Sequence, residues 1–149
     1  MNIVRSIEPL IWALVGIIWI GPGTFAGTIA LTLHTIAALS KLYSEAVESI
    51  DSGPIEALQA TGATRLQTIM YAVVPQVLPP FISFTIYRWD INVRLSTIIG
   101  LVGGGGIGFI LIQWIRQFQY ESAGLAVWMI TITVASLDFI SSEIRKRFV

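Results

Sequence analysis

The sequence predicts an all-α integral membrane protein, on the basis of its composition and its apolar runs. Of 149 residues, 54% are hydrophobic and only 12% are charged, whereas an ordinary soluble domain has roughly 25% charged residues. Mean hydropathy is +0.76. Two apolar runs, 24–43 and 122–141, are about twenty residues long. A helix of that length crosses a hydrocarbon core of ~30 Å.

The composition also excludes several classes of function. Formal net charge is zero, so the chain has no overall attraction to nucleic acid. It has no Cys and one His, which leaves no disulfide and little from which to build a metal site or a membrane enzyme. No glycine is followed by the Lys-Ser or Lys-Thr of a phosphate-binding loop. The chain is therefore expected to bind no cofactor and to hydrolyse no ATP itself.

The first three apolar runs differ in length. Residues 9–20 predict a helix of about 18 Å, which is a short or truncated span or a half-helix. Gly21-Pro22-Gly23 ends it, and residues 24–43 are long enough to span. The third run begins near residue 73, and its helix is expected to continue to about Val102.

Three further segments follow. Residues 100–108 are Gly-rich and cannot form a regular helix interior without cost. Residues 109–119 have apolar and polar positions near helical spacing, which predicts an interfacial helix lying at the membrane surface. The run 122–141 is the last of about four spans. Basic residues follow it at Arg145, Lys146 and Arg147.

The basic residues also predict the orientation of the spans. A cluster of Lys and Arg marks the cytoplasmic side, so the C-terminus is expected in the cytoplasm. Counting back one span at a time places residues 95–120 outside, the polar segment 44–75 inside and Gly21–Gly23 outside. We therefore expect a multi-pass protein with its polar segment in the cytoplasm.

The polar segment is predicted to contain two short helices. Pro54 is preorganised for a first helical turn, which makes Gly53 the N-cap and Glu56 the N3 residue. Gly62 is expected to end this helix as a left-handed cap.

The second of these helices begins at a capping box. Thr64 is followed three residues later by Gln67, which is the spacing of that motif. Pro75 is expected to limit or kink this second helix.

The polar segment resembles the cytoplasmic coupling motif of ABC-importer permeases, which is Glu-Ala-Ala, three residues, Gly, nine residues and Ile-x-Leu-Pro. Here Glu56-Ala57-Leu58 is followed by three residues and Gly62, and nine more residues lead to Ala72-Val73-Val74-Pro75. The departures, Leu58, Ala72 and Val74, are all apolar. The alternative is an amphipathic helical hairpin in a loop.

This resemblance implies that the first short helix docks into a groove of a partner ATPase. Closure of the ATPase dimer would then move the membrane helices as rigid bodies. The alternative role of the leading carboxylate, Glu56, is only to compensate the helix dipole. The coupling residues expected from the motif are Glu56, Ala57, Leu58, Gly62, Ala63 and Pro75.

A second group of polar residues lies within the third span: Arg88, Asp90, Asn92 and Arg94. If the span enters the membrane near Pro79, these side chains lie close to the bilayer centre, where ionisable groups usually face a bundle interior or a water-filled path. A lining with net positive charge favours an anion. Alternatively, the span starts earlier and these side chains snorkel to the outer interface.

The same stretch resembles the permeases of phosphonate importers. The matching run is Tyr87-Arg88-Trp89-Asp90-Ile91-Asn92-Val93-Arg94, followed by Ile98-Ile99-Gly100-Leu101-Val102-Gly103 and Gly105-Gly106-Ile107-Gly108. Asp51-Ser52-Gly53-Pro54 also fits, whereas Glu8-Pro9 reverses the usual order. Such permeases normally have further helices ahead of this point, so the resemblance implies a fragment or an abbreviated form.

The resemblance implies a type I ABC-importer transmembrane domain with a MetI-like fold. It would act as a homodimer in the bacterial inner membrane, with separate ATPase subunits that carry ATP and Mg, and with a periplasmic phosphonate-binding protein. Alternating access would import phosphonate or a related phosphorus oxyanion. The alternatives are a permease for another solute such as methionine and, in a different class, an ion channel.

The glycine run fits two roles, a flexible segment beside a gate and close helix packing. The residues concerned are Gly103, Gly105, Gly106 and Gly108. Their GxGxxG spacing is not expected to bind a dinucleotide, because no βαβ unit surrounds it.

Four other polar or aromatic positions are expected to be structural. His34 lies in an apolar span, where Thr32 and Thr35 are nearby partners. Asp138 is expected to pair with a basic residue of another helix, with Arg145 as a distant candidate. Trp19 and Trp114 suit interfacial anchoring.

Overall fold

The computed structural model describes residues 2–148 and the side chains of residues 4–146. That part of the chain is helical throughout, apart from short connections. The helices are α1 Asn2–Ser6, α2 Pro9–Ile20, α3 Thr24–Glu48, α4 Gly53–Ala60, α5 Arg65–Thr68, the π-helical turn η1 Ile69–Val73, α6 Val74–Ile99, the π-helical turn η2 Gly100–Gly104, α7 Gly106–Arg116 and α8 Tyr120–Phe148.

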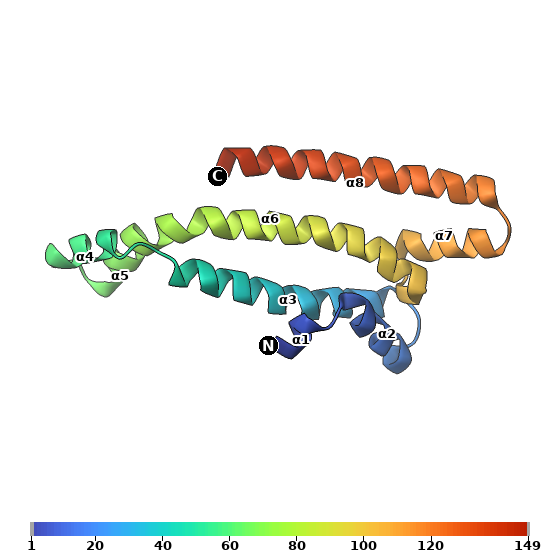
Figure 1. The fold of residues 1–149 in the computed structure, drawn as a ribbon, viewed down its shortest axis with the longest axis horizontal. Helices are drawn as coiled ribbons and strands as arrows, with labels where there is room; N and C mark the ends of the chain where they lie inside the picture. Colours follow the sequence, from blue (N-terminus) through green and yellow to red (C-terminus); the bar gives the residue numbers. More distant parts are fainter. Residues whose placement is uncertain (1, 149) are drawn as a thin grey trace.

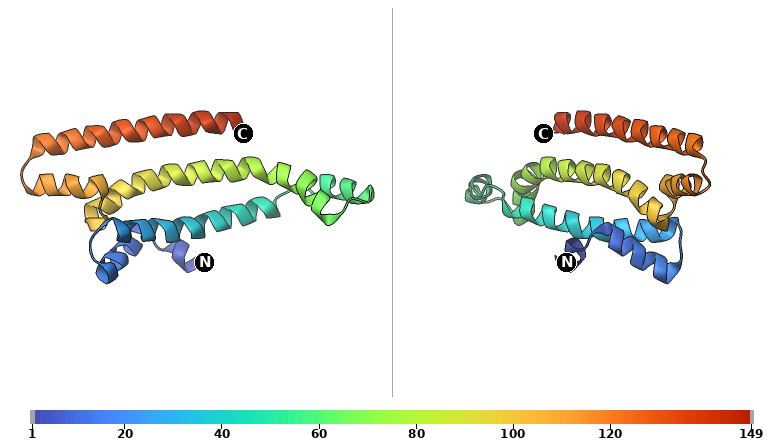
Figure 2. Two further views of the ribbon diagram at one scale, coloured as in Figure 1. Left: turned by 180° about the vertical axis from the view of Figure 1, so that it is seen from behind. Right: turned by 45° about the vertical axis from the view of Figure 1, so that its right-hand side comes forward.

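Three long helices run side by side along the molecule, with α6 between α3 and α8 (Figure 1). By length and composition, Thr24–Glu48, Arg65–Gly104 and Tyr120–Lys146 are each able to cross a membrane. The expected all-α membrane fold is confirmed. The first expected span is the short α2, which packs against α3 at one end (Figure 2).

The helices approach closely because small residues line their contacts. Ala13 of α2, Ala30 of α3 and Ile99 at the end of α6 form one buried cluster. Small side chains let helix backbones come close together, which is the usual basis of helix packing in membranes.

The second span extends further than the sequence predicted. Helix α3 continues to Glu48, so residues 44–48 belong to it rather than to a polar hairpin. The ion pair between Lys41 Nζ and Glu45 Oε1, at 2.8 Å, lies one turn apart on this helix and supports its last turns.

Pro75 does not end the helix that precedes it. The helical segment Arg65–Gly104 is continuous over 40 residues, and the π-helical turn η1 comes directly before Pro75. There the N–H of Val74 donates to the carbonyl of Ile69, five residues back. Proline lacks an N–H and crowds the preceding turn. The wider π-helical turn accommodates it without a break.

Helix α7 differs from the expected surface helix. It spans Gly106–Arg116 and runs alongside α8 (Figure 1). Leu111 is buried against Ala123 and Ala126 of α8, and Trp114 packs on the same cluster. Helix α7 therefore follows the direction of the candidate span α8. One apolar edge of α7 thus meets the small residues of α8, while Phe109, Ile110 and Ile115 remain exposed.

Candidate functional site

The expected coupling helix forms as α4, one residue out of the expected register. Ser52, not Gly53, is its N-cap residue. Asp51 Oδ1 accepts a hydrogen bond from the Gly53 N–H at 3.0 Å, and the Glu56 N–H donates to the Ser52 carbonyl at 2.9 Å. Glu56 is therefore at N4 rather than N3. It remains in the first turn, where a carboxylate is favoured.

The end of α4 has the predicted geometry. Gly62 has a φ of 79°. Its N–H donates to the Gln59 carbonyl at 3.0 Å, and the Ala63 N–H donates to the Leu58 carbonyl at 3.2 Å. These two bonds define a Schellman motif.

The capping box that begins α5 is also present. The Thr64 N–H donates to Gln67 Oε1 at 2.8 Å, and the Gln67 N–H donates to Thr64 Oγ1 at 3.5 Å. Together with the Schellman motif, it fixes the turn between the two short helices without any contact from outside the segment.

This hairpin projects beyond the ends of α3 and α6 (Figure 1). No residue of α4 is buried. Large apolar side chains around it are exposed, among them Leu66 at 71% and Tyr71 at 74%. A projecting helix flanked by exposed apolar side chains has the form of a surface for a helix-in-groove contact.

The four polar residues of α6 separate onto two faces. Positions two apart on a helix lie about 200° apart, so Arg88 and Asn92 face α3 whereas Asp90 and Arg94 face α8. Asn92 Nδ2 donates to Thr35 Oγ1 at 2.9 Å, and the Thr35 hydroxyl is also within 3.0 Å of Asn92 Oδ1. The sequence assigned all four to the lining of one pathway, and in the structure one pair contacts α3 and the other contacts α8.

Arg88 is buried between α3 and α6, with 8% of its surface exposed. Its Nη2 lies 2.8 Å from His34 Nδ1. Arginine only donates, so Nδ1 accepts and carries no proton. Arg88 Nε is buried without a partner. Within the described chain, this cation has no carboxylate partner. The expected Thr partners of His34 are wrong, because Thr32 bonds to the Thr28 carbonyl and Thr35 to Asn92.

Arg94 has two carboxylate partners. Its Nη2 lies 2.9 Å from Asp90 Oδ2 and 2.8 Å from Asp138 Oδ1 of α8. The expected Asp90–Arg94 pair is therefore present. Asp138 does pair with a basic residue of another helix, but that residue is Arg94 rather than Arg145. These carboxylates compensate the charge of Arg94. Of the two arginines of this group in α6, Arg88 is therefore the one without a carboxylate partner.

Helix α6 makes two further polar contacts that the sequence analysis missed, one with α3 and one with the loop that follows it. The hydroxyls of Tyr43 and Thr85 are hydrogen bonded. The side chain of Gln76 bonds to the backbone of Asp51. Gln76 is the only amide or charged side chain between Gln67 and Arg88, and this isolation was the signal that could have identified it.

The glycine run packs tightly against the start of α3. The Gly23 N–H donates to the Gly103 carbonyl at 3.0 Å. A Cβ at Gly105 would lie 2.6 Å from the Thr24 nitrogen, and one at Gly108 would overlap the Thr97 carbonyl oxygen. Gly103, Gly105 and Gly106 all have positive φ, which favours glycine. The structure thus shows close packing at this segment.

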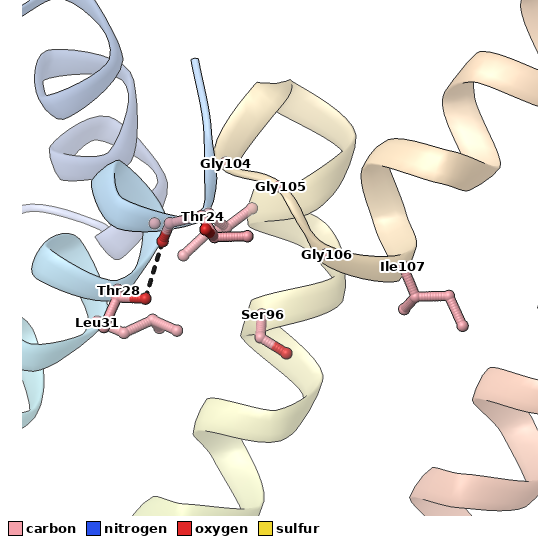
Figure 3. A pocket seen from close by; sticks show the side chains of 10 residues that line it. Thr24, Thr28, Leu31, Ser96, Gly104, Gly105, Gly106 and Ile107 are labelled. Carbon is pink, nitrogen blue, oxygen red and sulfur yellow. Dashed lines mark hydrogen bonds between the residues drawn. The ribbon is translucent and has the colours of Figure 1, made fainter. Parts of the chain in front are cut away.

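A cavity of about 150 Å³ lies beside this segment, between α3 and the end of α6. Figure 3 shows Gly104–Gly106 passing close to Thr24, with Ser96 across the cavity. The Thr28 hydroxyl donates to the Thr24 carbonyl at 2.8 Å and that of Ser96 to the Val93 carbonyl at 2.7 Å. Both hydroxyl groups thus donate their protons to backbone carbonyls of their own helices.

The chain is similar to proteins of one transport family along its whole length. The family model described as "Binding-protein-dependent transport system inner membrane component" matches residues 1–149. A protein of Escherichia coli (strain K12) named as a cryptic phosphonate transport system permease, PhnE2, is 49% identical over 121 residues, which cover 81% of this chain and 99% of that protein. The phosphite transport system permease protein PtxC of Stutzerimonas stutzeri is 40% identical over 148 residues, which cover 99% of this chain and 54% of PtxC.

A solved structure shares the fold. A chain of the MetNI methionine ABC transporter, in an inward-facing conformation, matches with a TM-score of 0.75 and 26% sequence identity, covering 99% of this chain and 72% of that one. A match of both sequence and fold over nearly the whole chain is sufficient to assign the family. The chain belongs to the binding-protein-dependent transport system inner membrane components.

Proposed function

We propose that this chain is the permease subunit of an ATP-driven importer for phosphonate or a related small phosphorus oxyanion. The choice of substrate rests on the environment of Arg88. This side chain is buried, it is not paired with a carboxylate, and its Nε–H has no acceptor. A buried donor without an acceptor is costly, and an oxyanion is the ligand that satisfies it best.

The names of the similar proteins support the same substrate class. PhnE2 is named for phosphonate and PtxC for phosphite, at 49% and 40% identity, whereas the methionine transporter chain is 26% identical. Methionine is therefore the weaker alternative. The polar pathway would include Arg88 and Asn92, with Asp90 and Arg94 at its α8 side.

The projecting α4 supports the choice of partner. In the proposed complex it docks on a separate ATPase subunit, with Glu56, Ala57 and Leu58 on the leading turns and Gly62, Ala63 and Pro75 holding the hairpin. ATP and Mg are bound by that ATPase and not by this chain. A periplasmic binding protein delivers the anion, and a second copy of the permease completes the pathway for alternating access.

The orientation follows from this partner. The hairpin and the carboxyl end of α8 lie toward the same end of the molecule (Figure 1). Docking on a cytoplasmic ATPase would place both in the cytoplasm, in agreement with the basic residues Arg145 and Lys146. The glycine segment and the loop 117–119 would then face the periplasm, where the binding protein docks.

The test is ATP hydrolysis in proteoliposomes that contain the chain, its ATPase and its binding protein. We expect methylphosphonate to stimulate hydrolysis only when the binding protein is present. Stimulation by methionine and not by phosphonate or phosphite would contradict the substrate class. An ion current that needs no ATPase would contradict the importer itself and support a channel.

A further inference from the structure

One side chain of α6 holds the loop that leads into α4. Gln76 Oε1 accepts a hydrogen bond from the Asp51 N–H at 2.9 Å, and Gln76 Nε2 donates to the Asp51 carbonyl at 3.3 Å. The same Nε2 donates to the Ala72 carbonyl at 2.8 Å. A single amide thus occupies both backbone groups of Asp51 and is itself held in place by its own helix. We call this contact the Gln76 clasp.

Asp51 in turn lies directly before the N-cap residue of α4 and bonds to its first turn. Its carboxylate accepts from the Gly53 N–H at 3.0 Å, in the first residue of the helix. At the other end of α4, the Schellman motif and the capping box lead into α5 without a flexible break. Both ends of α4 are therefore attached to the continuous helical segment Arg65–Gly104, one through the chain and one through the clasp.

The link from α3 to α4 is weaker. It consists of residues 49–52, between the C-cap residue of α3 and the N-cap residue of α4. Among the described residues, no side-chain hydrogen bond or ion pair joins α4 to α3, whereas α4 packs against α5 and η1. Without the clasp, α4 would be attached to the Arg65–Gly104 segment only through its C-terminal turn, and a push on α4 would rotate it about that turn.

We propose that Gln76 is a positioning residue that makes α4 and α6 one mechanical unit. Movement of α4 is then delivered directly to α6, which carries Arg88. This inference rests on the proposed function, because it assumes that a partner ATPase moves α4. It assigns to Gln76 a role in coupling that lies outside the Glu56–Gly62 contact surface.

The first measurement is hydrogen–deuterium exchange in the assembled complex. Gln76→Leu removes all three hydrogen bonds of the side chain at nearly constant size. We expect the amides of residues 50–53, 55 and 56 to exchange about tenfold faster, which is the effect of losing hydrogen bonds of ordinary net strength. The matched control is Gln113→Leu, the same change at an exposed position of α7, which leaves these amides unaffected. Unchanged exchange in Gln76→Leu would overturn the clasp.

The second measurement is the number of phosphonate molecules imported per ATP hydrolysed. We expect this ratio to fall about tenfold in Gln76→Leu while the ATPase stays bound and active. Gln76→Glu keeps the acceptor for the Asp51 N–H and loses the donor, so an intermediate ratio is expected. If Gln76→Leu does not assemble, the ratio measured for Gln76→Glu tests the coupling role in its place. A ratio equal to that of Gln113→Leu in both variants would overturn the coupling role.

The two measurements distinguish failure of the proposed function from failure of the role of Gln76. If the unaltered complex imports no phosphonate, the proposed function fails, and the exchange rates still decide whether Gln76 fixes α4. If import is normal and the exchange rates do not respond, the proposed function stands and the role of Gln76 is wrong.

Discussion

At the scale of single residues, Arg88 combines deep burial with an uncompensated charge. Replacing it by Gln removes the cation and keeps much of the side-chain volume. We expect phosphonate uptake to fall ten- to a hundredfold, about the value of one hydrogen bond to a charged group. Uptake of labelled phosphonate, together with pull-down of the ATPase, measures the effect. Arg88→Lys is expected to restore part of the uptake, because it restores the charge without the guanidinium geometry.

The control for this prediction is Arg94→Gln. Arg94 is half-exposed and pairs with two carboxylates, so its loss should affect uptake less. Equal losses in both variants, or loss of the ATPase from the Arg88→Gln complex, would show that Arg88 is a structural residue.

Glycine positions give a second prediction at this scale. Gly108→Ala would place a methyl group against the Thr97 carbonyl and the Leu101 nitrogen. We expect a loss of stability of about 1–3 kcal/mol, as in other overpacked sites. Thermal unfolding in detergent measures it. Gly124→Ala in α8 is the control, since beyond its chain neighbours and the backbone of its own helix nothing lies within 4 Å of its Cβ position. It should be neutral or stabilising by up to about 1 kcal/mol.

At the scale of elements, α4 holds together by its own caps and presents an exposed surface. Glu56→Lys places a positive charge at the positive end of the helix dipole and on the proposed docking face. We expect association with the ATPase to be lost while thermal stability changes by less than about 1 kcal/mol. Co-purification of the two subunits measures association. Glu121→Lys, an exposed first-turn carboxylate of α8 at the opposite end, should leave association intact. Normal association in Glu56→Lys would contradict docking through α4.

The elements also show which features are local enough to predict. The cap at Gly62 and the capping box at Thr64 and Gln67 depend on residues a few positions apart, and both form as predicted. The N-cap is Ser52 rather than the predicted Gly53, because the Asp51 side chain supplies the cap bond. The preference of proline for the first helical position, on which the prediction rested, does not include this contact.

Features that depend on other helices were predicted poorly. The His34–Arg88 and Arg94–Asp138 contacts depend on the register between helices far apart in the sequence, which no local sequence pattern encodes. The packing of α7 on α8 was missed for a related reason. An apolar stripe at helical spacing is the same whether it meets lipid headgroups or the small residues Ala123 and Ala126.

At the scale of the whole molecule, the proposed topology predicts which residues each side of the membrane can reach. The chain contains no Cys, so each introduced Cys is a unique label. Gln119→Cys, in the loop between α7 and α8, should react with an impermeant maleimide added outside intact cells. Gln59→Cys, on exposed α4, should react only after permeabilisation. The reverse pattern would invert the topology and contradict docking on a cytoplasmic ATPase.

Three polar contacts between α3 and α6 form an antiparallel ladder: Tyr43–Thr85, His34–Arg88 and Thr35–Asn92. Sliding one helix along the other by a single turn, about 5.4 Å, would break every rung at once. These contacts therefore oppose sliding of α3 along α6. We therefore expect α3 and α6 to keep their register and to move together when the protein changes conformation.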